Sequence, residues 1–184
     1  MKVTWVVASA AAIKSEWYSP DTMKKIGPVW GSWKTWRNFN TDNVVCHDLA
    51  KSKDLLGRAF QAVCNFYVYR SNFQDLGRPI GINLYDGDYT LECTDIEDII
   101  SLHLASVDAD MVLLLGFDFS KPQPMADPLD NHLVQNRHGM QYSIIKNSKS
   151  QWVAIDHDHR LDQNYELLPN FTRDTMSNVL RLLT

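Results

Sequence analysis

A glycine and an aspartate follow the most apolar segment of the chain. Residues 111–119 read MVLLLGFDF, so Gly116 and Asp118 come directly after an uninterrupted apolar run. Glycine lets the backbone turn close beside a ligand, and a carboxylate at the carboxyl edge of a sheet can accept hydrogen bonds from sugar hydroxyls. Alternatively, Asp118 caps its own turn through backbone amides. Both interpretations place Asp118 at the end of a buried strand.

A second polar group follows the segment 121–128 (KPQPMADP), in which three prolines predict a loop. The group consists of Asn131, His132, Asn136, Arg137 and His138. Histidine titrates near neutral pH and can act as a general base, whereas the arginine fork suits a phosphate. We therefore take Asn136, Arg137 and His138 as candidate binding and catalytic residues. The alternative is a solvated polar loop.

Two further patterns suggest metal chemistry only at first sight. The run Asp156–His159 alternates carboxylates and imidazoles, but neighbours on an extended segment point to opposite sides. It is therefore predicted to be a polar turn, with no metal site and no cofactor. Cys46, Cys64 and Cys93 form no CxxC pair, which predicts free thiols.

Tryptophans gather early in the chain, at positions 17, 30, 33 and 36. Trp30, Trp33, Trp36 and Arg37 are candidate interface residues, because aromatic side chains beside cations form protein hot spots or stack on bases and sugars. The alternative is a small core beneath a long loop. The net charge is −4, from 18 Lys and Arg against 22 Asp and Glu, and disfavours nucleic acid as a partner.

The elements that must position these residues alternate along the chain. Apolar runs predict buried strands at 3–9, 43–46, 65–69, 80–84, 111–115, 152–155 and 165–168. Helical spacing predicts helices after Asp48, over 96–108, over 141–148 and from 172 onwards. Strands that are apolar throughout are typical of a sheet covered on both faces. The chain is thus predicted to be a single domain, 1–184, of α/β class: a doubly wound, mainly parallel, Rossmann-like sheet of about six to seven strands.

Nothing in the sequence predicts a membrane span, because no apolar run approaches 18 residues. The apolar run from Val3 to Ile13 imitates a signal peptide, but cleavage at Ala10 would leave too short a run before it. We interpret 3–8 as a buried strand. The expected location is cytoplasmic or virion-associated, without secretion through a signal peptide.

The order of these motifs resembles the compact, Rossmann-like bacterial CMP-sialic-acid sialyltransferases. In that family a helix leads to an apolar strand ending in Gly-x-Asp-Phe, as residues 96–108 lead to Gly116-Phe117-Asp118-Phe119 here. A mobile loop with a catalytic histidine then precedes a short helix and a strand. The resemblance implies that His138 is the general base that deprotonates an acceptor hydroxyl, that Asp118 lies beside the donor nucleotide, and that 121–137 forms a lid. It also implies sialyl transfer without a metal.

The first turn departs from that family pattern. The family carries Gly-x-Gly-Pro-Ser, whereas this chain has Ala8-Ser9-Ala10-Ala11-Ala12 and no glycine before Gly27. Ser9 can still offer its amide to an anion, although less closely. The sequence therefore predicts a Rossmann-like domain that resembles a nucleotide-sugar-dependent glycosyltransferase, either active or catalytically degraded. The alternative is a non-enzymatic structural or interaction protein of a larger assembly, such as a virus particle, with protein partners or self-assembly.

Overall fold

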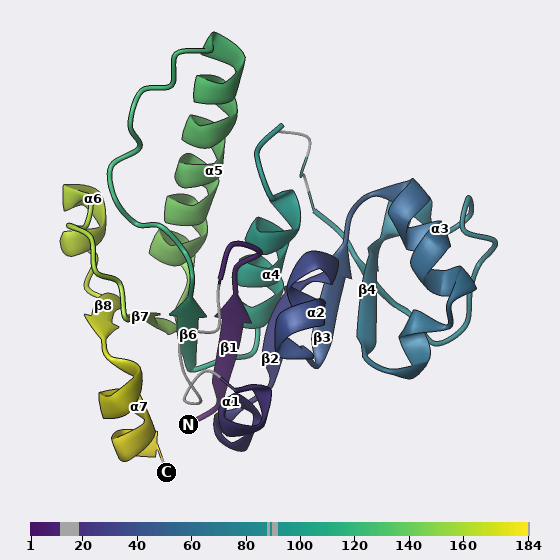
Figure 1. The fold of residues 1–184 in the computed structure, drawn as a ribbon, viewed down its shortest axis with the longest axis horizontal. Helices are drawn as coiled ribbons and strands as arrows, with labels where there is room; N and C mark the ends of the chain where they lie inside the picture. Colours follow the sequence, from purple (N-terminus) through teal and green to yellow (C-terminus); the bar gives the residue numbers. More distant parts are fainter. Residues whose placement is uncertain (12–18, 88, 90–91, 184) are drawn as a thin grey trace.

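One parallel sheet runs through the whole molecule (Figure 1). The computed structural model describes residues 1–11, 19–87, 89 and 92–183. The strand order is β5-β4-β3-β2-β1-β6-β7-β8, and every neighbouring pair is parallel. The strands are β1 (Val3–Val7), β2 (Val29–Ser32), β3 (Asn43–Cys46), β4 (Asn65–Tyr69), β5 (Asn83–Tyr85), β6 (Met111–Leu115), β7 (Gln151–Ile155) and β8 (Phe171–Asp174). The doubly wound α/β prediction is confirmed, with eight strands in place of six to seven.

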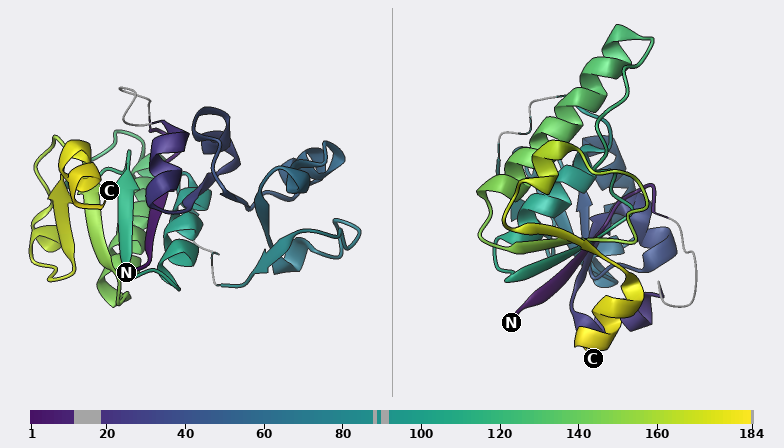
Figure 2. Two further views of the ribbon diagram at one scale, coloured as in Figure 1. Left: turned by 90° about the horizontal axis from the view of Figure 1, so that it is seen from below. Right: turned by 90° about the vertical axis from the view of Figure 1, so that its left-hand side faces the viewer.

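Helices cover both faces of this sheet (Figure 2). They are α1 (Pro20–Ile26), α2 (Trp33–Phe39), α3 (Leu49–Gly57), α4 (Ile96–Ser106), α5 (Pro128–Asn147), α6 (Gln163–Glu166) and α7 (Met176–Leu183). Side chains of α1, α2 and α7 pack in one core cluster against Trp5 and Val7. Side chains of α4, α5 and α6 pack in another, against Val6 on the opposite side of the same strand. This two-sided burial explains why the central strands are apolar without alternation.

The N-terminal strand and its neighbour β6 form the centre of the sheet. All five residues of β1 are buried, as predicted for 3–8, and they pair in register from Val3 beside Met111 to Val7 beside Leu115. No helix in the described part of the chain is long and apolar enough to cross a membrane.

Four corrections to the predicted strands are needed. The run 165–168 is not a strand: Asp162 caps α6 by accepting a hydrogen bond from Asn164 N, and Tyr165 points into the core. The last strand, β8, instead lies at 171–174, where we predicted the final helix to begin. Pairing with β7 outweighed the helical spacing there, so α7 begins at Met176. Strand β5 is shifted to Asn83–Tyr85, and β2 was missed.

Helix α5 is the largest correction. Only 141–148 was predicted to be helical, and 121–137 was expected to be a loop and lid. In the structure the helix spans Pro128–Asn147, with Pro128 at its first position and the Asp127 carboxylate accepting from Leu129 N and Asp130 N. The N-terminal half of α5 projects beyond the carboxyl edge of the sheet (Figures 1 and 2). Because water surrounds much of that half, it carries no continuous apolar stripe that the sequence could reveal.

Candidate functional site

The candidate site lies at the point where the strand order reverses. From β1 the chain continues to β2 on one side, while β6 pairs on the other side. In open α/β sheets, ligands bind outside the carboxyl ends of the strands at such a switch point. A cavity of about 240 Å³ lies there, lined by Ala11, by residues 115–118 and by residues 155–159. The turns after β1, β6 and β7 therefore enclose it together.

Gly116 allows two of these turns to approach each other. Its φ is +79°, a conformation that side-chain-bearing residues rarely adopt. A Cβ at this position would lie 2.4 Å from Ala11 Cβ. The close backbone approach expected at Gly116 is thus present, and the neighbour that demands it is the turn after β1.

Asp118 combines the two roles considered for it. Its carboxylate accepts a hydrogen bond from Ser120 N at 2.8 Å, so it caps its own turn. It also lines the cavity. Burial opposes ionisation, but the Ser120 amide and the nearby imidazoles of His157 and His159 outweigh it, and the pKa of Asp118 is lowered. The carboxylate is therefore ionised at neutral pH.

The turn after β7 supplies imidazoles that we had not placed in the site. His157 lines the cavity and packs edge-on against Phe119, and burial lowers its pKa despite the charge of Asp118. Asp156 accepts from Met176 N at the start of α7, which ties the turn to the next helix. Among the described residues no three His, Cys, Asp or Glu side chains form a group that could hold a metal ion. Only the position of this turn in the fold could have revealed these histidines, because β7 lies next to β6 in the sheet.

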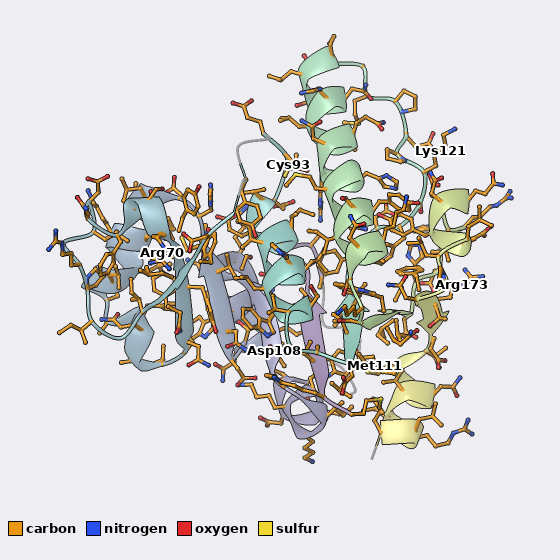
Figure 3. The ribbon with its side chains drawn as sticks, turned by 180° about the vertical axis from the view of Figure 1, so that it is seen from behind. Arg70, Cys93, Asp108, Met111, Lys121 and Arg173 are labelled. Carbon is orange, nitrogen blue, oxygen red and sulfur yellow. The ribbon has the colours of Figure 1, made fainter. Side chains whose placement is uncertain are left out.

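A wider groove of about 1050 Å³ adjoins the cavity. Asp118 and His159 line both hollows, so they lie where the two meet. Lys121 and Arg160 contribute positive charge to the groove; Figure 3 labels Lys121 on the segment that leads from β6 to α5. Hollows of some 300–1,000 Å³ are typical of small-molecule sites, so cavity and groove together have room for a small molecule.

His138 lies outside the lining of both hollows. It comes from α5, is half-buried, and packs edge-on against Tyr165 at 5.3 Å between ring centroids. Its Nε2 is buried and has no hydrogen-bond partner. Burial lowers the pKa of His138, against the charges of Asp162 and Asp118. The structure thus keeps this imidazole neutral but does not bring it to the cavity, and its role as base stays a prediction.

Ser9 makes its contacts with the protein itself. Its amide donates to both carboxylate oxygens of Asp98, at 3.1 and 2.9 Å, and its hydroxyl donates to Oδ1 at 2.7 Å. The side chain of Asp98 is completely buried, and burial raises its pKa to about 6. Asp98 comes from the first turn of α4 and was absent from our sequence-based candidates. A carboxylate inside an apolar helix face was the signal that could have revealed it.

Asn136 and Arg137 bind the segment that leads into α4, and neither lines the hollows. Asn136 Nδ2 donates to Glu92 O at 2.9 Å. Arg137 lies 3.4 Å from Asp95 and 3.5 Å from Asp98. These residues attach the middle of α5 to the body of the protein.

The tryptophans are packed within the fold. Trp30 in β2 contacts Tyr67 at 4.8 Å, Trp36 in α2 meets Phe60 edge-on at 4.9 Å, and Lys51 lies over the ring of Trp33. All three indoles are half-buried, whereas Arg37 is exposed. Trp17 lies outside the described residues. This packing favours the interpretation of a small local core.

Comparison with known proteins adds little. No protein-family model matches the chain, and no curated protein matches it. One solved structure that it matches is orotidine 5'-monophosphate decarboxylase from Metallosphaera sedula, with 11% identity over 100% of this chain and 96% of that chain. The TM-score is 0.33, so this likeness supports no statement about function. Fold and site together define a doubly wound parallel α/β protein with a cavity at the carboxyl edge of its sheet.

Proposed function

We propose that this protein is a nucleotide-sugar-dependent glycosyltransferase whose donor binds in the cavity and groove at the carboxyl edge. The observation that carries the proposal is the cavity at the β1–β6 switch point, which opens beside a groove large enough for the rest of such a donor. Asp118 supports it further, since an ionised carboxylate at this edge can orient sugar or ribose hydroxyls. The resemblance to CMP-sialic-acid sialyltransferases points to the same class.

The reaction requires a base near the acceptor. An acceptor hydroxyl oxygen attacks the anomeric carbon, the bond from that carbon to the phosphate oxygen breaks, and the nucleotide leaves with the electron pair. We propose that His159 is the general base that accepts the proton of the acceptor hydroxyl. Its side chain is exposed and lines both hollows beside Asp118. His138 is the competing base, because the resemblance favours it. General-base catalysis contributes about 10²–10⁴-fold.

Positively charged side chains of the groove can bind the negatively charged phosphate of the donor. Lys121 and Arg160 line the groove, and the guanidinium fork of Arg160 suits a phosphate. Asp162 and Glu166 line the same groove and confine the positive charge to part of it. We therefore place the phosphate of the donor near Lys121 and Arg160.

The test combines binding and turnover. Thermal unfolding is measured with CMP, UDP and GDP and their sugar conjugates. A binding nucleotide at about 100 times its Kd stabilises the protein by about 2.7 kcal/mol. Asp118→Asn should weaken this stabilisation, while His159→Ala should keep binding and lower transfer by about 10²–10⁴-fold. His132→Ala is the matched control, because it removes an exposed imidazole of α5 away from both hollows.

The outcomes separate the alternatives. Absence of stabilisation by every nucleotide would reject the glycosyltransferase proposal. Loss of transfer in His138→Ala but not in His159→Ala would return the base to His138. The assembly hypothesis predicts stable association that disappears when Trp30, Trp33 or Trp36 is made polar. These indoles pack within the fold, which weakens the assembly hypothesis, whereas the open cavity supports the glycosyltransferase proposal.

A further inference from the structure

A carboxylate of the protein itself, that of Asp98 in α4, lies against the turn after β1. The carboxylate of Asp98 receives three hydrogen bonds from Ser9, two from the amide and one from the hydroxyl. Arg137 Nη2 lies 3.5 Å from its Oδ2. The side chain has no exposed surface. A backbone amide, a hydroxyl and a guanidinium are the donors that proteins commonly use for phosphate oxygens.

The neighbouring hydroxyls extend this arrangement. Ser32 Oγ lies 2.8 Å from Ser9 Oγ and accepts from Lys34 N and Thr35 N. Because the single proton of the Ser9 hydroxyl goes to Asp98, the Ser32 hydroxyl donates to Ser9. The ends of β1 and β2 are therefore joined to α4 through one chain of hydrogen bonds that terminates on Asp98.

We propose that Asp98 is a specificity-determining residue that occupies the anion position of the β1 turn and excludes a ligand phosphate from it. This inference rests on the proposed function, since it concerns how the same carboxyl edge receives its donor. The cavity agrees with it, because Ala11 belongs to the lining and Ser9 does not. The anionic part of a ligand is accordingly directed to the groove, where Lys121 and Arg160 lie.

Removal of Asp98 should leave a folded protein with an anion-sized gap. Asp95 lies 3.4 Å from Arg137 and 3.1 Å from Lys34, so the guanidinium keeps one partner. The Ser9 amide and hydroxyl lose their acceptor. Buried donors without partners are costly, so a small anion that fits the gap is bound.

The first experiment measures phosphate and pyrophosphate binding by thermal unfolding. We expect the Tm gain of Asp98→Ala at saturating pyrophosphate to exceed that of the unchanged protein by about 5 °C or more, because any binding in the groove is common to both proteins. Asp95→Ala is the matched control: it also removes one carboxylate near Arg137 but leaves Ser9 paired, so it should gain no more than the unchanged protein does. A folded Asp98→Ala that ignores both anions would overturn the inference.

The second experiment needs no variant. Amide chemical shifts of the unchanged protein are followed during titration with pyrophosphate and with UDP. We expect the Ser9 amide to keep its shift; movement of Ser9 in the range that reports direct contact would overturn the inference. The same titration is repeated with CMP and GDP, and failure of the Gly116 and Asp118 amides to move with any of the three nucleotides would instead count against the proposed function. The two failures are thus distinguishable in one set of spectra.

Discussion

Asp98 is a fully buried carboxylate that joins helix α4 to the turn after β1. A buried carboxylate is costly unless its charge is met, and here Ser9 and Arg137 meet it only in part. Burial consequently raises its pKa to about 6, from 3.8. The folded protein therefore holds this proton at a higher pH than the unfolded chain does.

This shift predicts a pH dependence with a defined sign. As pH rises from about 4 to 6, the unfolded chain loses the Asp98 proton while the folded protein still holds it. The contribution of Asp98 to the free energy of unfolding therefore falls over this range, by about 3 kcal/mol in total. Asp98→Asn should abolish this loss, as measured by denaturant unfolding at a series of pH values.

Asp118 provides the opposite control. Its pKa is lowered in the folded protein, so its contribution to stability is present above the unfolded pKa and disappears as pH falls. The difference between the unchanged protein and Asp118→Asn should therefore grow with pH, whereas that for Asp98→Asn shrinks. Parallel trends in the two variants would contradict the assignment of the Asp98 pKa.

At the scale of elements, α5 has two halves with different environments. Its C-terminal half packs Ile145 into the core, and Gln141 donates to Asp118 O at 3.1 Å. Its N-terminal half projects into water, with Met125 and Leu129 near its start 47% and 61% exposed. Contacts of Asn136 and Arg137 mark the boundary between the halves.

Asp127→Ala should therefore act locally. Loss of the N-cap costs about 1 kcal/mol of helix stability, so amide exchange over 128–134 should accelerate while the free energy of global unfolding hardly changes. Ile145→Ala, in the packed half, should cost about 2–5 kcal/mol globally. Equal global losses in the two variants would show that the projecting half is integrated into the core after all.

The sequence predicted best those elements whose burial is reflected in their own residue types. Strands β1, β3, β6 and β7 are buried along most of their length and are mainly apolar, and β4 buries Phe66 and Val68. Strand β8 is partly exposed at the edge, and β2 contains Gly31, so neither has this pattern. Gly116 and Asp118 were predicted in the site because they follow such a strand. His159 was not, because the sequence does not show which strand ends are neighbours. Asp98 was not, because it lies on a helix, and the sequence does not show that this helix meets the turn after β1.

For the whole molecule, the core is unevenly distributed along the sheet. All residues of β1 are buried, whereas β5 at the far edge has three residues of which one is buried. The side chains around Phe66, including Val44, Leu55 and Phe60, form a cluster of their own beside β4 and α3. The β4–β5 end therefore has the smaller share of buried apolar surface.

This distribution predicts that the β4–β5 end opens first. Native-state amide exchange in mild denaturant should give lower opening free energies for 65–85 than for β1 and β6. Phe66→Ala removes a fully buried ring and should lower the value at that end by about 3–5 kcal/mol. Identical opening free energies in all strands, before and after the substitution, would mean that the sheet opens only as one unit.

The pairing of β1 with β6 also concerns synthesis. Val3 lies beside Met111, so β1 leaves the ribosome roughly a hundred residues before the strand that becomes its neighbour on the β6 side. At about 5–20 residues per second, that interval is on the order of ten seconds. During that interval one backbone edge of a mainly apolar segment has no partner, so we expect the nascent chain to bind chaperones that shield such segments.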